Sequence, residues 1–291
     1  MQENKDPPPT KWNKWQRKLE HSDSPMPTDG SPQSTLYWFN EESWDRFTEW
    51  SINPTNLWIG PTAFNMTVAT RVGPEKCLGD ERVKNSLRHW TPDHVAFMPA
   101  YFCLQIEKAY LIFTSNKIGY ILGDILLAYG RGELPFHGRT NKLWGVDVDC
   151  LYFPLFVGAM FNACNHWIAV CVNFIEKTVE VFDCLQGRNR QYVEKFAVMI
   201  PRIVKTVAPP VNKKYLLLEK YSIVEVPLKA RLNKSLCDCG AYALKHLECQ
   251  FLGLDLSLVD DEIIQDCRQK IALDIWEAAK DLILIELMTQ Y

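Results

Sequence analysis

The sequence lacks a surplus of charge of either sign. Its 32 lysines and arginines nearly balance 35 aspartates and glutamates, which gives a formal net charge of −3. A protein that binds nucleic acid through the phosphates usually carries a clear basic surplus. We therefore expect no direct nucleic-acid binding.

Long apolar runs are also missing. The longest mainly apolar stretch, residues 151–163, is interrupted by Pro154, Gly158 and Asn162. It is shorter than the roughly 20 apolar residues that a membrane-spanning helix needs, so we expect no membrane partner. The N-terminal residues are polar and rich in proline, without the apolar core of a secretory signal. These absences predict an intracellular protein, in the nucleus or the cytoplasm with the nucleus favoured, whose ten cysteines are reduced thiols.

Composition divides the chain into two parts. Residues 1–35 are rich in proline, lysine, serine and aspartate, so they predict a flexible or disordered tail. Apolar residues make up 47% of the whole chain and charged residues 23%, a balance that supports a sizeable core. Residues 36–291 contain no internal repeat, and we expect a single domain there.

Hydrophobic periodicity separates helical from extended segments. A helical pattern covers residues 104–130, with a turn signal at residues 114–117. Short apolar runs rich in β-branched and aromatic residues predict strands at residues 146–157, 167–174, 178–182 and 222–228. Two further helices are predicted, at residues 240–252 with Gly253 as a stop and at residues 260–287. Helices before and after a block of strands indicate an α+β domain.

Three segments carry the side chains of a candidate nucleophilic site. His166 opens one predicted strand, Asp183 closes the next, and Cys239 stands at the start of a predicted helix. His166 and Asp183 are 17 residues apart. That separation suits two antiparallel strands of about seven or eight residues and a short turn. The start of one strand then lies beside the end of the other, so the imidazole and the carboxylate should meet.

Cys239 has the position that a reactive thiol needs. A thiol attacks a carbonyl as the thiolate, and a free cysteine has a pKa of about 8.5. The partial positive charge at a helix N-terminus and a neighbouring imidazolium both lower that pKa. Asp183 would fix the tautomer of His166 and stabilise its charged form. The pattern predicts a His–Asp–Cys triad.

Other cysteines offer two competing interpretations. Cys237 lies two residues before Cys239, but it falls outside the predicted helix start and lacks the following glycine that lets a substrate backbone approach. A zinc site would use Cys237, Cys239, His246 and Cys249. The spacings miss the usual cysteine pairing, and the last two residues lie about two turns or more along the helix. We therefore predict a site that needs no metal and no cofactor.

The triad segments resemble those of one protease family, the ubiquitin-like-protein-specific (SUMO or sentrin) proteases. The similar motifs are His166-Trp167 before an apolar strand, Asp183 at the end of the next strand, and Asp238-Cys239-Gly240 at a helix start. The chain order His, Asp, Cys matches as well. Residues 146–155 are similar to the strand that precedes the histidine in this family, and residues 241–253 resemble the plant branch.

This resemblance implies a papain-like cysteine protease fold, with a central, mostly antiparallel sheet flanked by helices and the nucleophile at a helix N-terminus. It implies an isopeptidase or endopeptidase that cleaves after the C-terminal Gly-Gly of SUMO or a related modifier. His166 would be the general base, Asp183 its orienting partner and Cys239 the nucleophile. The expected partners are SUMO or another ubiquitin-like protein and its conjugates.

The resemblance also implies substrate-binding residues. Trp167 would form one wall of a narrow channel that admits a Gly-Gly tail. Trp90, in a segment similar to the one that carries the family's channel tryptophan, would form the other wall. The family usually places a glutamine six residues before the cysteine, where it donates to the oxyanion, and here that position is Asn233. Asn233 has the same amide on a shorter stem and is the candidate oxyanion donor.

Two alternative functions stay open from the sequence. The same His–Asp–Cys machinery can pass an acyl group to an acceptor other than water, as in an acyltransferase. A domain of this fold can also bind a ubiquitin-like protein without catalysis, and Asn233 is the feature that favours this alternative.

Overall fold

The computed structural model describes residues 33–52, 57–59, 62–64, 94–134, 140–158, 166–278 and 280. Most of the predicted tail, and Trp90, lie outside these ranges. The helices are α2 (Ser34–Tyr37), α3 (Glu41–Ile52), α6 (Ala100–Ser115), α7 (Asp124–Gly130), α8 (Arg190–Val207), α9 (Pro210–Lys213), α10 (Cys239–Leu252), the 3₁₀ turn η2 (Leu256–Leu258) and α11 (Ile264–Ala278). The strands are β1 (Leu57–Ile59), β2 (Thr62–Phe64), β3 (His94–Phe97), β4 (Val148–Val157), β5 (His166–Asn173), β6 (Thr178–Phe182) and β7 (Ser222–Glu225).

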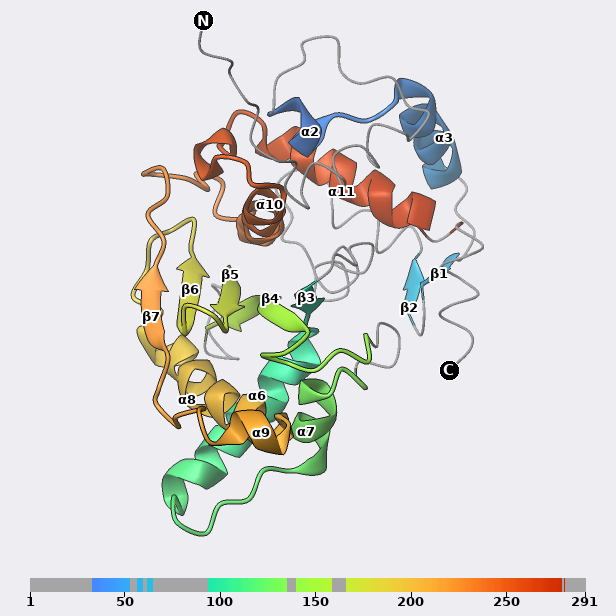
Figure 1. Cartoon of the computed structure of the whole chain (residues 1–291). Helices are drawn as coiled ribbons and strands as arrows, with labels where there is room; N and C mark the ends of the chain where they lie inside the picture. Colours follow the sequence, from blue (N-terminus) through green and yellow to red (C-terminus); the bar gives the residue numbers. More distant parts are fainter. Residues whose placement is uncertain are drawn as a thin grey trace, which may run out of the picture.

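A five-stranded mixed sheet forms the centre of the fold, in the order β3-β4-β5-β6-β7 (Figure 1). Strands β4, β5 and β6 pair antiparallel, whereas β3 and β7 pair parallel to β4 and β6. The β5–β6 register pairs Ala169 with Phe182 and Asn173 with Thr178. The predicted α+β class and the predicted hairpin are confirmed. Within this sheet only the three central strands pair antiparallel, and β1 and β2 form a separate antiparallel pair.

Helices cover both faces of this sheet. Figure 1 shows α6 and α8 on one side of the strands and α10 and α11 on the other. On the α8 side, the β5 residues of the apolar cluster are Ile168, Val170 and Val172. On the α10 side, they are Trp167, Ala169 and Cys171. A strand that is buried on both faces has a continuous apolar sequence rather than an alternating one, as β5 does.

Helix α8 has no counterpart among the elements predicted from the sequence. It buries Phe196 and Ile200 against the sheet although Pro201 lies inside it. Proline has no backbone N–H, so the carbonyl of Ala197 loses the donor that a helix normally supplies four residues later. The backbone N–H of Tyr221 donates to that carbonyl instead, at 3.1 Å. A tertiary hydrogen bond thus completes a helix that the local sequence disfavours.

Helix α10 begins at Cys239, packs against β5 and ends where the sequence predicts. Its C-cap Gly253 has a φ of 66°, a left-handed conformation that favours glycine. The backbone N–H of Leu254 donates to the carbonyl of Cys249 at 2.9 Å and closes the helix end. The cap therefore fixes the length of the helix that carries the candidate nucleophile.

Helix α11 begins later than the sequence predicts, at Ile264 rather than at residue 260. The Asp260 carboxylate accepts the backbone N–H of Glu262 at 3.0 Å, which forms a turn ahead of the helix. Residues 281–291 lie outside the described ranges. Across those ranges, no helix is both long enough and apolar enough to cross a membrane.

Candidate active site

His166 and Asp183 meet at the open end of the β5–β6 hairpin. His166 is the first residue of β5 and Asp183 directly follows β6, so the hairpin brings them together as the sequence predicts. Nε2 of His166 donates to Oδ1 of Asp183 at 2.6 Å. The two side chains are 14% and 6% exposed. A short hydrogen bond to an ionised group at this depth fixes the orientation of the imidazole ring.

Three further donors hold the Asp183 carboxylate. Oδ1 accepts the backbone N–H of Leu185 at 2.9 Å, and Oδ2 accepts the Gly187 N–H and the Asn189 side-chain amide, both at 2.6 Å. A Cβ at Gly187 would lie 3.1 Å from Oδ2, a tight contact that favours glycine. Burial raises the pKa of Asp183, but hydrogen bonds from His166 and from this turn outweigh it and lower the pKa. Asn189 is thus a positioning residue that the sequence analysis missed.

Cys239 lies on the other side of the same imidazole. It stands at the N-terminus of α10, is 1% exposed, and its side chain hydrogen-bonds His166. Because Asp183 occupies Nε2, Nδ1 is the ring nitrogen that faces the sulfur. Burial lowers the pKa of His166, but the hydrogen bonds to Asp183 and Cys239 raise it by more. The net effect is a pKa of about 9. A protonated imidazole beside a sulfur is the arrangement that activates a thiol nucleophile.

Asp238, the residue before Cys239, forms a buried ion pair with α11. Nη1 of Arg268 lies 2.6 Å from Oδ1 of Asp238, and the two side chains are 1% and 2% exposed. Oδ2 of Asp238 accepts from Gln265 at 3.2 Å and from the Ser235 hydroxyl at 2.5 Å. These contacts lock the start of α10 onto α11. The paired residues are 30 positions apart, so no local pattern in the sequence predicts them.

Replacing Arg268 by methionine is expected to lower the free energy of unfolding by about 3–5 kcal/mol. Methionine keeps much of the apolar stem but leaves the buried Asp238 carboxylate without its partner. Urea unfolding followed by circular dichroism measures the change. The double variant Arg268→Met/Asp238→Asn removes the unpaired charge and should recover part of the loss. A loss below about 1 kcal/mol for Arg268→Met alone would contradict a stabilising role for the pair.

Asn233, the candidate oxyanion donor, is buried and has a left-handed backbone with a φ of 59°. Its Oδ1 accepts the backbone N–H of Asp238 at 2.9 Å, which anchors the amide beside the start of α10. Its Nδ2 is buried and has no hydrogen-bond partner in the described part of the chain. The amide lies beside the Cys184 thiol. Because a thiol sulfur is a weak acceptor, the amide N–H stays available to an incoming oxygen.

Trp167 directly follows His166 and is 4% exposed. Its ring packs edge-on against Phe156, with the ring centroids 5.4 Å apart. The side chain belongs to the apolar cluster that also contains Cys239. Trp167 therefore lies on the nucleophile's side of the sheet. Trp90, the second predicted channel wall, lies outside the described ranges.

The zinc group weighed against the triad does not assemble. Within the described ranges, the one group of three or more potential ligands with atoms within 4.8 Å of one another is His166, Asp183 and Cys184. That group contains none of the four residues of the zinc interpretation. His246 is fully buried on α10, and burial lowers its pKa to about 4. Cys237 is partly exposed and precedes the helix.

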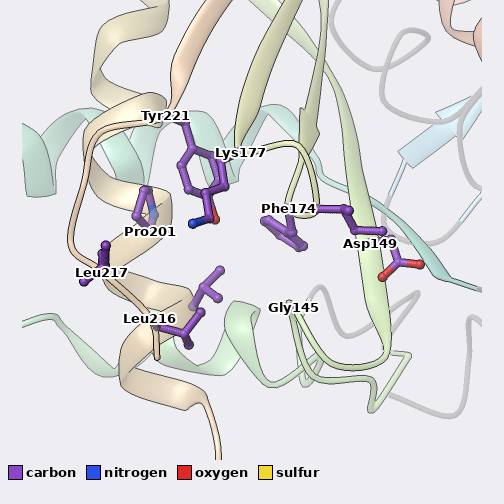
Figure 2. Close-up of a pocket in the computed structure, with 10 residues that line it drawn as sticks. Gly145, Asp149, Phe174, Lys177, Pro201, Leu216, Leu217 and Tyr221 are labelled. Carbon is purple, nitrogen blue, oxygen red and sulfur yellow. The ribbon is translucent and has the colours of Figure 1, made fainter. Parts of the chain in front are cut away.

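A separate pocket lies at the other end of the hairpin. Figure 2 shows it between α8, the β5–β6 turn and the segment that leads into β7, with Phe174, Lys177 and Tyr221 among its lining residues. Phe174 and Lys177 are the first and last residues of the turn, whereas His166 and Asp183 lie at the opposite ends of the two strands. An extended strand of eight residues spans roughly 25 Å. This pocket is therefore not part of the triad site.

Comparison with known proteins finds both a family and a shared fold. A family model described as Ulp1 protease family, C-terminal catalytic domain, matches residues 78–283. The C-terminal Ulp1 protease domain in complex with Smt3, the yeast ortholog of SUMO, superposes with a TM-score of 0.56 at 16% identity, over 86% of this chain and 99% of that chain. The catalytic domain of the Chaetomium thermophilum Ulp1-like SUMO protease gives a TM-score of 0.54 at 14% identity, over 82% and 90%. A search of curated proteins gave no match.

At these identities, the superpositions show a common fold, and they confirm the predicted papain-like architecture. The family match covers most of the chain, and it includes the hairpin and the helix that carry His166, Asp183 and Cys239. The chain belongs to the Ulp1 protease family and is a cysteine protease.

Proposed function

We propose that this protease cleaves after the C-terminal Gly-Gly of SUMO or a related ubiquitin-like modifier, as an isopeptidase on conjugates or an endopeptidase on precursors. One observation carries the proposal. The His166 imidazole bonds Asp183 at 2.6 Å on one side and Cys239 on the other. Family membership supports the chemistry, and a structural neighbour that was solved in complex with a SUMO ortholog supports the class of modifier.

In the proposed reaction, the Cys239 sulfur attacks the carbonyl carbon of the modifier's last glycine. A thioester forms, and the lysine or peptide nitrogen leaves with a proton from His166. His166 then takes a proton from water, which attacks the thioester and frees the sulfur and the modifier's carboxylate. Asp183 keeps Nε2 of His166 occupied, so Nδ1 handles the proton at the reacting atoms.

Asn233 is the proposed donor to the oxyanion. Its Nδ2 is buried and has no hydrogen-bond partner in the described part of the chain, so an oxyanion would satisfy it. The first backbone N–H groups of an α-helix have no acceptor within the helix, so those at the start of α10 can supply further hydrogen bonds. A side-chain donor of this kind contributes about 3 kcal/mol to stabilising the transition state.

Trp167 is the proposed wall of the substrate channel, with Trp90 as the opposite wall. Trp167 follows the proposed general base and is held by its edge contact with Phe156. Glycine has no Cβ, so two indole rings can close on a Gly-Gly tail and would clash with other residues. Such a channel selects modifiers by the shape of the tail.

A panel of electrophilic probes tests the proposal. Each probe carries SUMO, ubiquitin or another ubiquitin-like protein with an electrophile after its Gly-Gly tail. The purified full chain should form a covalent adduct with the SUMO probe at least about tenfold faster than with the ubiquitin probe. A matched SUMO probe that ends in Ala-Gly should react poorly, because the added methyl group meets the channel wall. Binding without an adduct, or an acyl adduct from an acyl-CoA and none from the panel, would overturn the proposal.

A further inference from the structure

A second thiol borders the imidazole of the triad. Cys184 directly follows Asp183 and is 3% exposed. Its sulfur lies within 4.8 Å of a His166 ring nitrogen and of an Asp183 carboxylate oxygen. Cys239 hydrogen-bonds the same ring, and both cysteines belong to the apolar cluster on the α10 side of the sheet. Two sulfurs from distant segments therefore share one histidine.

The two thiols differ in their surroundings. Burial, followed by the negative charges of Asp183 and Cys239, raises the pKa of Cys184. Cys184 therefore stays a neutral thiol while Cys239, at the helix N-terminus and beside protonated His166, is the sulfur set up to react first. A reactive thiolate with a resting thiol beside it is the arrangement from which disulfides form during oxidation.

We propose that Cys184 is the resolving cysteine of this site and forms a reversible disulfide with Cys239 when a peroxide oxidises the nucleophile. The inference rests on the proposed role of Cys239 as the reactive sulfur. The proposed role of Cys184 lies outside the peptidase reaction.

Each step balances with hydrogen peroxide as the oxidant. The Cys239 thiolate attacks one peroxide oxygen, the O–O bond breaks, and the departing hydroxide takes the His166 proton and leaves as water. Cys239 is now a sulfenic acid and His166 is neutral. His166 then accepts the Cys184 proton, the Cys184 sulfur attacks the Cys239 sulfur, and the S–O bond breaks. The second hydroxide leaves as water with that proton, so two thiols and one peroxide give a disulfide and two waters.

The neighbouring cysteines compete poorly for this role. Cys237 is partly exposed and lies two residues before Cys239, where a disulfide would close a very small ring. Cys249 lies near the far end of α10, about 15 Å along the helix from Cys239. Among the cysteines that the structure describes, Cys184 is the one that shares the imidazole with Cys239. The disulfide would block the nucleophile and protect it from further oxidation, which thiols do not reverse.

Mass spectrometry of the peroxide-treated full chain tests the pair. After treatment without thiols and alkylation of free cysteines, we expect a loss of two hydrogens, about 2 Da, and a linked peptide that joins Cys184 to Cys239. Dithiothreitol should reverse both changes. Cys237→Ala should form the same link, whereas Cys184→Ala should gain two or three oxygens on Cys239 that dithiothreitol does not remove.

The result with the unmodified protein is enough to test the proposal, even if a variant fails to fold. Direct oxidation of Cys239 to the sulfinic acid with no linked peptide, or a link from Cys239 to Cys237, would overturn the proposal. Because the readout is mass, it is separate from cleavage. A chain that forms the link and reacts with no modifier probe would keep this inference and overturn the proposed function.

Discussion

Replacing Cys239 by alanine should lower the rate of cleavage of a SUMO precursor by at least about 10⁴-fold. The sulfur is the atom proposed to attack the carbonyl, and alanine leaves nothing to form the thioester. The buried site accepts the smaller side chain with little disturbance, because Cys239 begins a helix that Gly253 caps and that packs on β5. Gel-based cleavage assays at fixed enzyme concentration measure the loss.

Cys237→Ala is the matched control for this prediction. It removes a thiol two residues away that is partly exposed and outside α10. The control should keep cleavage within about threefold of the unmodified chain. Equal losses in both variants, or cleavage that survives in Cys239→Ala, would contradict the assignment of the nucleophile.

Replacing Asp183 by asparagine should lower kcat/KM by about 10³–10⁴-fold. The carboxylate accepts from four groups, namely His166, Leu185, Gly187 and Asn189. Each oxygen accepts from two of these groups, so an asparagine amide would turn its NH₂ group toward two donors, and facing His166 it would favour the wrong tautomer. Asp183→Glu, which keeps the charge and shifts its place, is the control and should retain more activity.

The same substitution should move the alkaline limb of the pH–rate profile. The pKa of His166 is raised to about 9 in the folded chain, against about 6.5 for a free histidine. The stabilising interaction of protonated His166 is therefore complete below about pH 6.5 and is lost as the pH rises through about 9. Without the Asp183 charge, the pKa of His166 falls, so activity should decline at a lower pH. An unchanged limb in Asp183→Asn would contradict this electrostatic account.

The His166–Asp183 pair of the proposed triad is predictable from the sequence because its contact is local. His166 and Asp183 lie on one hairpin with a short turn, so strand pairing alone brings the two side chains together. Cys239 is recognisable because it stands at a helix start. What the sequence does not reveal is how the hairpin docks on α10, which depends on burial of the apolar cluster between them.

The elements missed by the sequence analysis depend on partners far along the chain. Helix α8 contains Pro201, and its free Ala197 carbonyl is satisfied by Tyr221, so the compensation is invisible locally. The Asp238–Arg268 pair joins two helices. The parallel pairing of β3 and β7 at the two sheet edges likewise requires long connections, whose course no local pattern fixes.

The site of adduct formation with the SUMO electrophile tests the central claim most directly. Digestion of the adduct and peptide mass mapping should find the modifier's tail on the Cys239 sulfur and on no other cysteine, and the adduct should form much more slowly in Asp183→Asn. Attachment to Cys237 or Cys184, or labelling that is equally fast without the Asp183 carboxylate, would contradict the account.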